Sequence, residues 1–240
     1  MGGTSGMDST GWDERYAAVD LVWGAEPNRW LAAEAADLPP GRALDLAAGE
    51  GRNAIWLARR GWDVTAVDFS GVAVERGRRL AGSEDADVAG RLTWKVADVR
   101  DEVGPAGAYS LVCVIYLHLV ADERRRAMRH AANAVAPGGV LLVVGHDTTN
   151  PIDGVGGPQD LRVLFTPDDI VADLNAGQNT APKAEAGASA VGGSVAGGSV
   201  ADWVVERAER VRRPVRTADG ETRDAIDALV RLRRPASKFG

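Results

Sequence analysis

Residues 45–53 contain both glycine and acidic residues and read Asp-Leu-Ala-Ala-Gly-Glu-Gly-Arg-Asn. They begin within a short, mostly apolar segment, residues 43–46. Glycine lets the backbone approach a ligand closely, and the start of the following helix offers free N–H groups. The pattern Gly49-x-Gly51-x-x-Ala54, with Asp68 further on, also fits a dinucleotide-binding fingerprint. The segment therefore predicts a site for a nucleotide-type ligand, and the pattern alone leaves the ligand open.

The charges near this loop favour one kind of ligand. A pyrophosphate would be repelled by Asp45 and Glu50, whereas S-adenosylmethionine has an ammonium, a sulfonium, a ribose diol and no phosphate. We expect Asp45 to face the ammonium group, directly or through water. We expect Asp68 to accept from both ribose hydroxyls and Asp98 from the adenine amino group. An aspartate beside a turn often only caps it, but three after successive strands favour a binding edge.

Short apolar runs alternate with helical segments along most of the chain, which is typical of a parallel sheet covered on both faces. The fold expected is a doubly wound, mostly parallel α/β sheet of seven strands with a C-terminal antiparallel pair. The expected strands are residues 43–46, 64–67, 92–96, 111–116, 140–144, 203–211 and 225–232, the last two joined by a turn at Asp219-Gly220. The expected helices are residues 53–60, 70–83, 122–135 and 166–174, with 122–135 stopped by Pro137-Gly138-Gly139.

Four motifs are distinctive: Trp12-Asp-Glu-Arg-Tyr16, Trp23-Gly-x-Glu-Pro-Asn28, Gly49-Glu-Gly51-Arg-Asn53 with Trp56-Leu57-Ala58, and Tyr116-Leu-His118-Leu. With them the chain resembles the class I S-adenosylmethionine-dependent methyltransferases, which have a Rossmann-like fold. Within that class it is similar to the branch of tellurite-resistance and thiopurine methyltransferases. The resemblance implies methyl transfer from S-adenosylmethionine to a small-molecule acceptor, and a soft thiol or chalcogen nucleophile would suit this branch.

The resemblance also implies which residues contact the cofactor. They are Asp45, Ala47, Gly49, Gly51, Arg52, Asn53, Asp68, Phe69, Asp98 and Val99, with Tyr16 and Trp23 on an N-terminal lid. Two positions depart from the family pattern. Ala47-Ala48 stands where relatives usually have Gly-Cys, which adds a methyl group near the cofactor, and Tyr109-Ser110 stands where many carry an aspartate.

Residues expected near the end of the fourth and fifth strands could form the acceptor pocket, namely Tyr116, His118 and His146. A histidine at a strand end with a pKa near the working pH could act as a general base, and His118 is the candidate. The alternative is a histidine that only hydrogen-bonds a loop carbonyl. The basic stretch 207–216 also carries glutamates, so we expect it to be a solvated face.

The composition limits the classes of partner that the protein is expected to bind. A net charge of −6 over 240 residues argues against a broad nucleic-acid surface, and no apolar run is long enough to span a membrane. The single cysteine, Cys113, allows neither an internal disulfide nor a thiolate metal cluster, so we expect a cytoplasmic protein with no metal. The oligomeric state stays open.

The expected organisation is a disordered N-terminus, residues 1–11, followed by one methyltransferase domain, residues 12–240. This domain includes the lid, residues 12–30, and a flexible low-complexity loop, residues 177–201, which is rich in glycine, alanine and serine. Two other functions use the same glycine loop. One is an NAD(P)-dependent oxidoreductase, which the acidic residues and the lack of a Tyr-x-x-x-Lys pair disfavour. The other is a non-catalytic S-adenosylmethionine-binding protein.

Overall fold

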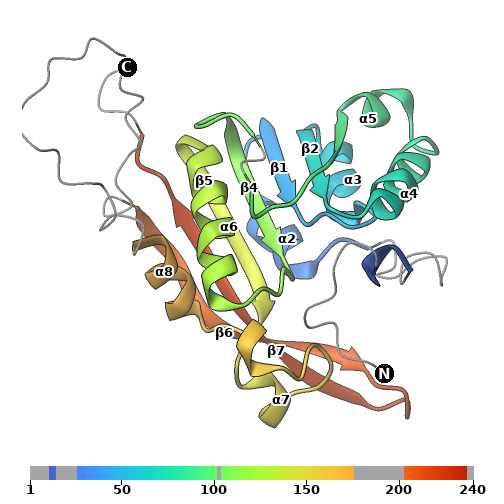
Figure 1. Ribbon diagram of the computed structural model, residues 1–240. Helices are drawn as coiled ribbons and strands as arrows, with labels where there is room; N and C mark the ends of the chain where they lie inside the picture. Colours follow the sequence, from blue (N-terminus) through green and yellow to red (C-terminus); the bar gives the residue numbers. More distant parts are fainter. Residues whose placement is uncertain (1–10, 15–25, 102–103, 176–202, 237–240) are drawn as a thin grey trace, which may run out of the picture.

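A seven-stranded sheet with the order β3-β2-β1-β4-β5-β7-β6 organises the computed structural model (Figure 1), which describes residues 11–14, 26–101, 104–175 and 203–236. The strands are β1 (Arg42–Leu46), β2 (Asp63–Asp68), β3 (Leu92–Val96), β4 (Tyr109–Ile115), β5 (Val135–His146), β6 (Val204–Arg216) and β7 (Thr222–Arg233). The pairs from β3 to β5 are parallel, whereas β7 is antiparallel to both β5 and β6. The predicted fold class is confirmed.

Helices cover both faces of the sheet. They are α2 (Arg29–Glu34), α3 (Arg52–Arg59), α4 (Gly71–Ala81), α5 (Ala86–Gly90), α6 (Ala121–Ala134), α7 (Asn150–Asp153) and α8 (Pro167–Asn175), with a 3₁₀ turn at Leu161–Val163. Side chains of α2 and α3 belong to the buried cluster on one face, and those of α6 and α8 to the cluster on the other. The two apolar layers bury the central strands from both sides, which explains the apolar runs 111–115 in β4 and 140–144 in β5.

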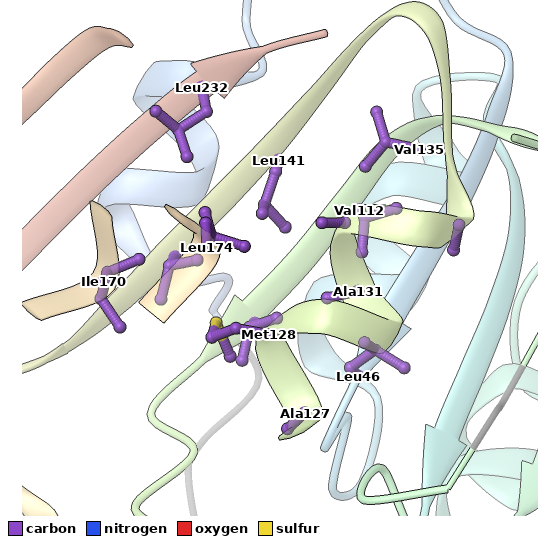
Figure 2. Close-up of a cluster of buried hydrophobic side chains, with 14 of the residues drawn as sticks. Leu46, Val112, Ala127, Met128, Ala131, Val135, Leu141, Ile170, Leu174 and Leu232 are labelled. Carbon is purple, nitrogen blue, oxygen red and sulfur yellow. The ribbon is translucent and has the colours of Figure 1, made fainter. Parts of the chain in front are cut away.

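Figure 2 shows the layer beneath α6 and α8. Met128 of α6 and Ile170 of α8 pack with Val112 of β4 and Leu141 of β5, and all four side chains are fully or almost fully buried. This apolar contact holds α6 and α8 against the sheet. It thereby fixes the strands whose carboxyl ends carry the candidate site.

The fifth strand begins earlier than the sequence predicts. Helix α6 ends at Ala134, and β5 runs from Val135 through Pro137-Gly138-Gly139 instead of starting at residue 140. The helix does stop before the proline, but the chain then pairs at once, because Val135 aligns with Tyr109 and a register shift follows on β4. Gly138 has a φ of +78°, so glycine allows the strand to pass this irregular point.

The C-terminal hairpin is also longer than predicted. Strands β6 and β7 extend to Arg216 and Thr222, and the predicted turn at Asp219-Gly220 is confirmed, with the Thr217 N–H donating to the Glu221 carbonyl at 2.9 Å. The added residues, 212–216 and 222–224, are exposed or half-buried, so they pair through backbone hydrogen bonds that an apolar pattern does not reveal. In Figure 1 the hairpin extends beyond the rest of the sheet, next to α7.

Several predictions fall outside the described residues. These include the low-complexity loop, residues 177–201, most of the N-terminal lid with Tyr16 and Trp23, and residues 1–10. Among the helices that the structure describes, none has the length and apolarity needed to cross a membrane.

Candidate functional site

Asp45 is a buried carboxylate near the carboxyl end of β1. Its side chain is 1% exposed, and neither carboxylate oxygen has a hydrogen-bond partner in the described part of the chain. Burial, together with the negative charge of Asp68, raises the pKa of Asp45 to about 7. A buried carboxyl group without a partner is costly, so this position suits a cationic group that arrives with a ligand.

The backbone after β1 turns sharply through left-handed conformations. Ala47, Gly49 and Gly51 have φ values of 59°, 57° and 79°. Ala47 is the one of these with a Cβ atom, so the conformation costs it about 1–2 kcal/mol. Helix α3 begins directly after this turn, and its N-cap residue is Gly51, which has no side chain to cap the first N–H groups. The predicted loop thus leads into a helix start that can receive polar ligand atoms.

Gly51 has a different steric neighbour from the one expected. A Cβ atom placed on Gly51 would lie 2.1 Å from Cη2 of Trp94, and one on Gly77 would lie 2.3 Å from Cζ3 of the same ring. The Trp94 indole of β3 therefore packs directly against both glycines. At Gly51 the structure requires glycine for this contact and for the positive φ, rather than for a ligand alone.

Asp68 joins the loop to the end of β2. Its Oδ2 atom accepts from the backbone N–H of Gly49 at 2.8 Å, and its Oδ1 atom accepts from that of Ser70 at 2.9 Å. Burial is the main cause of the raised pKa of this carboxyl group. Each oxygen has further accepting capacity, and half-buried Phe69 follows directly in the chain. Asp68 thus shapes the loop and stays suited to accept from ribose hydroxyls.

Asp98 already has a cationic partner. Its Oδ2 atom lies 2.6 Å from Nη2 of Arg100, and hydrogen bonds from Arg100 hold the pKa of Asp98 below its ordinary value. Arg100 also contacts Glu123, with Nη1 2.6 Å from Oε1. Val99, which lies between Asp98 and Arg100 in the chain, is buried. An adenine amino group at Asp98 would therefore share the carboxylate with Arg100.

Remaining cofactor positions lie at the start of α3. Asn53 is buried, and its Oδ1 atom accepts from the backbone N–H of Asn28 at 2.8 Å, which ties the segment before α2 to the loop. Asn28 in turn caps α2 through its own side chain. Arg52 is half-buried, and its positive charge partly offsets the rise in the pKa of Asp45.

The three predicted acceptor residues are brought together. The ring centroids of Tyr116 and His146 lie 4.9 Å apart, and those of His118 and His146 lie 5.3 Å apart with the planes at 13°. His146 ends β5 as expected, but β4 ends at Ile115, so Tyr116 and His118 follow the strand. Tyr116 has a φ of 58°, which is rare for a bulky residue and occurs mostly at functional sites.

His118 does not have the electrostatics expected of a general base. Burial and the neighbouring His146 lower the pKa of His118 to about 3, so the prediction of a pKa near the working pH is wrong. Its Nε2 atom is buried and has no hydrogen-bond partner among the described residues. His118 is therefore neutral at physiological pH, and its catalytic role stays a prediction.

Asp227 of β7 contacts the ring cluster formed by Tyr116, His118 and His146, and this role was not predicted from the sequence. The side chain is fully buried, and its Oδ2 atom accepts from Trp30 Nε1 at 3.0 Å, Tyr116 Oη at 2.8 Å and Arg213 Nε at 2.8 Å. Its Oδ1 atom lies 3.3 Å from Nδ1 of His146. Burial alone would raise the pKa of Asp227, but His146 and Arg213 hold it below its ordinary value.

A signal for Asp227 was present in the sequence. It interrupts the apolar run Ala225-Ile-Asp-Ala-Leu-Val, and a charged residue inside a buried strand needs partners. Arg213 corrects a second prediction. It lies in the basic stretch expected to be a solvated face, yet its side chain is only 22% exposed and bonds to Asp227 and Tyr116. Across the described residues, no cluster of three or more metal-ligating side chains was found.

Comparisons with known proteins agree with this fold. Residues 43–139, from β1 into β5, match the family described as "Methyltransferase domain". The glycine N-methyltransferase of Rattus norvegicus is 28% identical over 163 residues, which cover 62% of this chain and 55% of that protein. The chain spans about half or less of the length of the first curated relatives that it matches.

Solved structures show the same fold at low sequence identity. One, from a study of the conversion of a disulfide bond into a thioacetal group during echinomycin biosynthesis, has a TM-score of 0.61 and 20% identity, covering 89% of this chain and 84% of that one. TehB from Haemophilus influenzae has a TM-score of 0.63 and 15% identity, covering 86% and 62%. Residues 43–139 thus match a methyltransferase domain, and the chain shares its fold with these solved structures.

Proposed function

We propose that this protein transfers the methyl group of S-adenosylmethionine to a small acceptor that reacts through a soft nucleophile, such as a thiol or a chalcogen anion. The cofactor supplies an electrophilic methyl group, which the acceptor takes in line while the sulfonium sulfur keeps the bonding electron pair. The protein aligns the acceptor and excludes water, and these contributions need no strong base.

The observation that carries the cofactor assignment is the buried carboxylate of Asp45 beside the glycine loop, whose oxygens have no hydrogen-bond partner in the described ranges. An ammonium group there would remove the cost of burying this charge, whereas a pyrophosphate would increase it. Glu50, by contrast, forms an ion pair with Arg76 at 3.1 Å, so it contributes less repulsion than the sequence alone suggests. The case against a dinucleotide therefore rests on Asp45.

The acceptor side supports a soft nucleophile. His118 is neutral and buried, so it is a poor proton acceptor for a phenol or an amine that must be deprotonated. A thiol ionises more readily near neutral pH and needs less help. The neighbouring rings of Tyr116 and His146 offer a dry, polarisable surface for such an acceptor. The tellurite-resistance and thiopurine branch is part of this proposal, and the TehB likeness supports its fold alone.

The cofactor assignment is tested by calorimetric titration of the full chain with S-adenosylmethionine, S-adenosylhomocysteine and NAD⁺. We expect both adenosyl compounds to bind and NAD⁺ to give no heat of binding at the same concentrations. Binding of NAD⁺ alone would instead favour the oxidoreductase. Binding of the adenosyl compounds without turnover of any acceptor would favour the non-catalytic binder.

A further inference from the structure

Arg213 is held at its Nε atom by two residues of the ring cluster and the hairpin. Its Nε atom lies 2.8 Å from Oδ2 of Asp227 and 2.7 Å from the hydroxyl oxygen of Tyr116. Tyr116 is partly buried, and Asp227 is completely buried. The guanidinium group is therefore held by one edge, and little conformational entropy is left for it to lose when it binds a ligand.

The opposite edge of the guanidinium has no hydrogen-bond partner in the part of the chain that the structure describes. Among the described residues, neither Nη1 nor Nη2 of Arg213 makes a hydrogen bond, and Asp227 is the one carboxylate in ion-pair contact with it. Arg100 differs, because its terminal nitrogens bond to Asp98 and Glu123. Two parallel N–H groups at the end of a fixed guanidinium match the two oxygens of a carboxylate.

The surroundings of this open edge belong to the acceptor side. The Cζ atom of Arg213 lies 5.4 Å from the centroid of the Tyr116 ring, and that ring packs with His146. In the same cluster, Nε2 of His118 is buried and has no hydrogen-bond partner among the described residues, which independently favours a ligand atom at this place. The carboxylate of Asp227 is fully buried beneath these groups, so an incoming anion meets the guanidinium and not Asp227.

We propose that Nη1 and Nη2 of Arg213 bind a carboxylate group of the methyl acceptor, beside the rings of Tyr116, His118 and His146. The acceptor is then a small molecule that carries both a soft nucleophile and a carboxylate. This inference rests on the proposed function in that it identifies the ligand as the methyl acceptor. The anion-binding site itself is independent of turnover. Partial burial strengthens the contact, because the 22% exposed side chain is shielded from much of the solvent.

The test compares acceptors that differ in charge alone. Methyl transfer to 4-mercaptobenzoate is measured against 4-mercaptobenzamide, and transfer to 3-mercaptopropionate against 3-mercaptopropionamide. Binding of the two aromatic compounds to the protein loaded with S-adenosylhomocysteine is measured by calorimetry, which gives a result even without turnover. We expect the wild type to favour each carboxylate by roughly tenfold or more, the size of one lost charge-assisted contact.

Three variants assign the preference to the guanidinium. In Arg213→Met the preference should disappear, and in Arg213→Lys, which keeps the charge but lacks the parallel N–H groups, it should fall. Arg212→Met is the matched control, because Arg212 is the neighbouring residue on the opposite face of β6, 60% exposed and 3.8 Å from Asp224. It should keep the wild-type preference.

The outcomes separate this inference from the proposed function. Carboxylate-selective binding that Arg213→Met abolishes supports the site even if no thiol is methylated, in which case the proposed methyl acceptor class fails alone. Equal binding of acid and amide by the wild type overturns the site, whatever the turnover. The site is also overturned if Arg213→Lys keeps the full preference for the carboxylate. This second variant keeps the test valid if Arg213→Met does not fold.

Discussion

The hydroxyl group of Tyr116 lies 2.8 Å from Oδ2 of Asp227, although 111 residues separate the two in the chain. This contact joins the end of β4 to the C-terminal hairpin, and with it the ring cluster to a buried carboxylate. It also explains how Tyr116 keeps a left-handed backbone, since its hydroxyl group bonds to Asp227 and its ring packs against His146.

Asp227→Asn should lower kcat/KM for the acceptor by about tenfold or more, while the Kd for S-adenosylmethionine changes little. The amide keeps one accepting oxygen but replaces the other with a donor, so the arrangement of Tyr116, Arg213 and His146 is disturbed. Steady-state kinetics and calorimetry measure the two quantities. Asp224→Asn on the same strand, where Asp224 is 46% exposed, is the control and should leave both unchanged. Equal losses in cofactor and acceptor binding would show that Asp227 only supports the fold.

Asp45→Asn should weaken S-adenosylmethionine binding and remove its dependence on pH near neutrality. In the wild type, affinity should rise as the pH increases through about 7, because the carboxyl group must ionise to pair with the ammonium. In the variant the affinity should be low and flat between pH 6 and 8. Calorimetry over this range checks the prediction, and an unchanged pH profile in Asp45→Asn would remove Asp45 from the ammonium site.

The same substitution should stabilise the ligand-free protein. The pKa of Asp45 is about 7 in the folded chain against an ordinary 3.8, so the folded state holds this proton more tightly and the wild type loses stability as the pH rises from about 4 to 7. At pH 8 we expect Asp45→Asn to raise the free energy of unfolding by roughly 2–4 kcal/mol, with little difference at pH 4. Urea unfolding at both pH values measures this. A destabilised variant at pH 8 would mean that Asp45 has a stabilising partner.

Asp68→Ala should weaken S-adenosylmethionine binding by about 1.5–3 kcal/mol, the range for losing hydrogen bonds to a charged group. Asp68 accepts from the N–H groups of Gly49 and Ser70, so the loss includes the shape of the loop as well as the ribose contact. Calorimetry with S-adenosylmethionine measures the effect. Unchanged affinity would exclude Asp68 from the cofactor site.

Gly51→Ala should destabilise the protein by about 2 kcal/mol or more and should also weaken cofactor binding. The added methyl group would lie 2.1 Å from the Trp94 ring, and the φ of +79° is unfavourable for alanine. Gly71→Ala is the control, because a Cβ atom there meets nothing within 4 Å. Thermal unfolding followed by tryptophan fluorescence compares the two. If both variants unfolded alike, the packing of Trp94 on the loop would not be the reason for glycine.

His118→Ala separates the acceptor classes. Because the pKa of His118 is about 3, we expect a small loss of rate with a thiol acceptor. If the natural acceptor needed a positioned base, the loss would be roughly 10²–10⁴. Single-turnover rates with matched thiols and phenols measure the difference. A large loss with the thiol would return His118 to the role of general base.

The central sheet was predictable because each inner strand is mostly apolar and is bounded by turn residues. The runs containing Leu44, Val112 and Leu142 are buried on both faces, so composition alone identifies them. The outer part of the hairpin was not predictable in length, since β6 is mostly exposed and pairs through its backbone. Val135 was predicted to lie in the helix, because no local pattern shows that Val135 pairs with Tyr109, which lies 26 positions earlier. The register of this strand pair is also irregular at its start.

The cofactor loop was predictable and the acceptor side only in part. Asp45, Gly49 and Asp68 are close in sequence or follow neighbouring strands, so their meeting at one edge follows from the fold. Trp30 and Asp227, in contrast, meet across 197 positions. Such a contact depends on which strand occupies the place beside β5, and no local pattern contains that information.

The most direct test of the proposed function is methyl transfer itself, with the wild-type chain, S-adenosylmethionine carrying a labelled methyl group, and a panel of small thiols, phenols and chalcogen oxyanions. Mass spectrometry follows both the methylated product and S-adenosylhomocysteine. We expect labelled S-methyl or chalcogen-methyl product and S-adenosylhomocysteine in equal amounts, with phenols reacting far more slowly. Tight cofactor binding with no labelled product from any member of the panel would contradict the proposed activity.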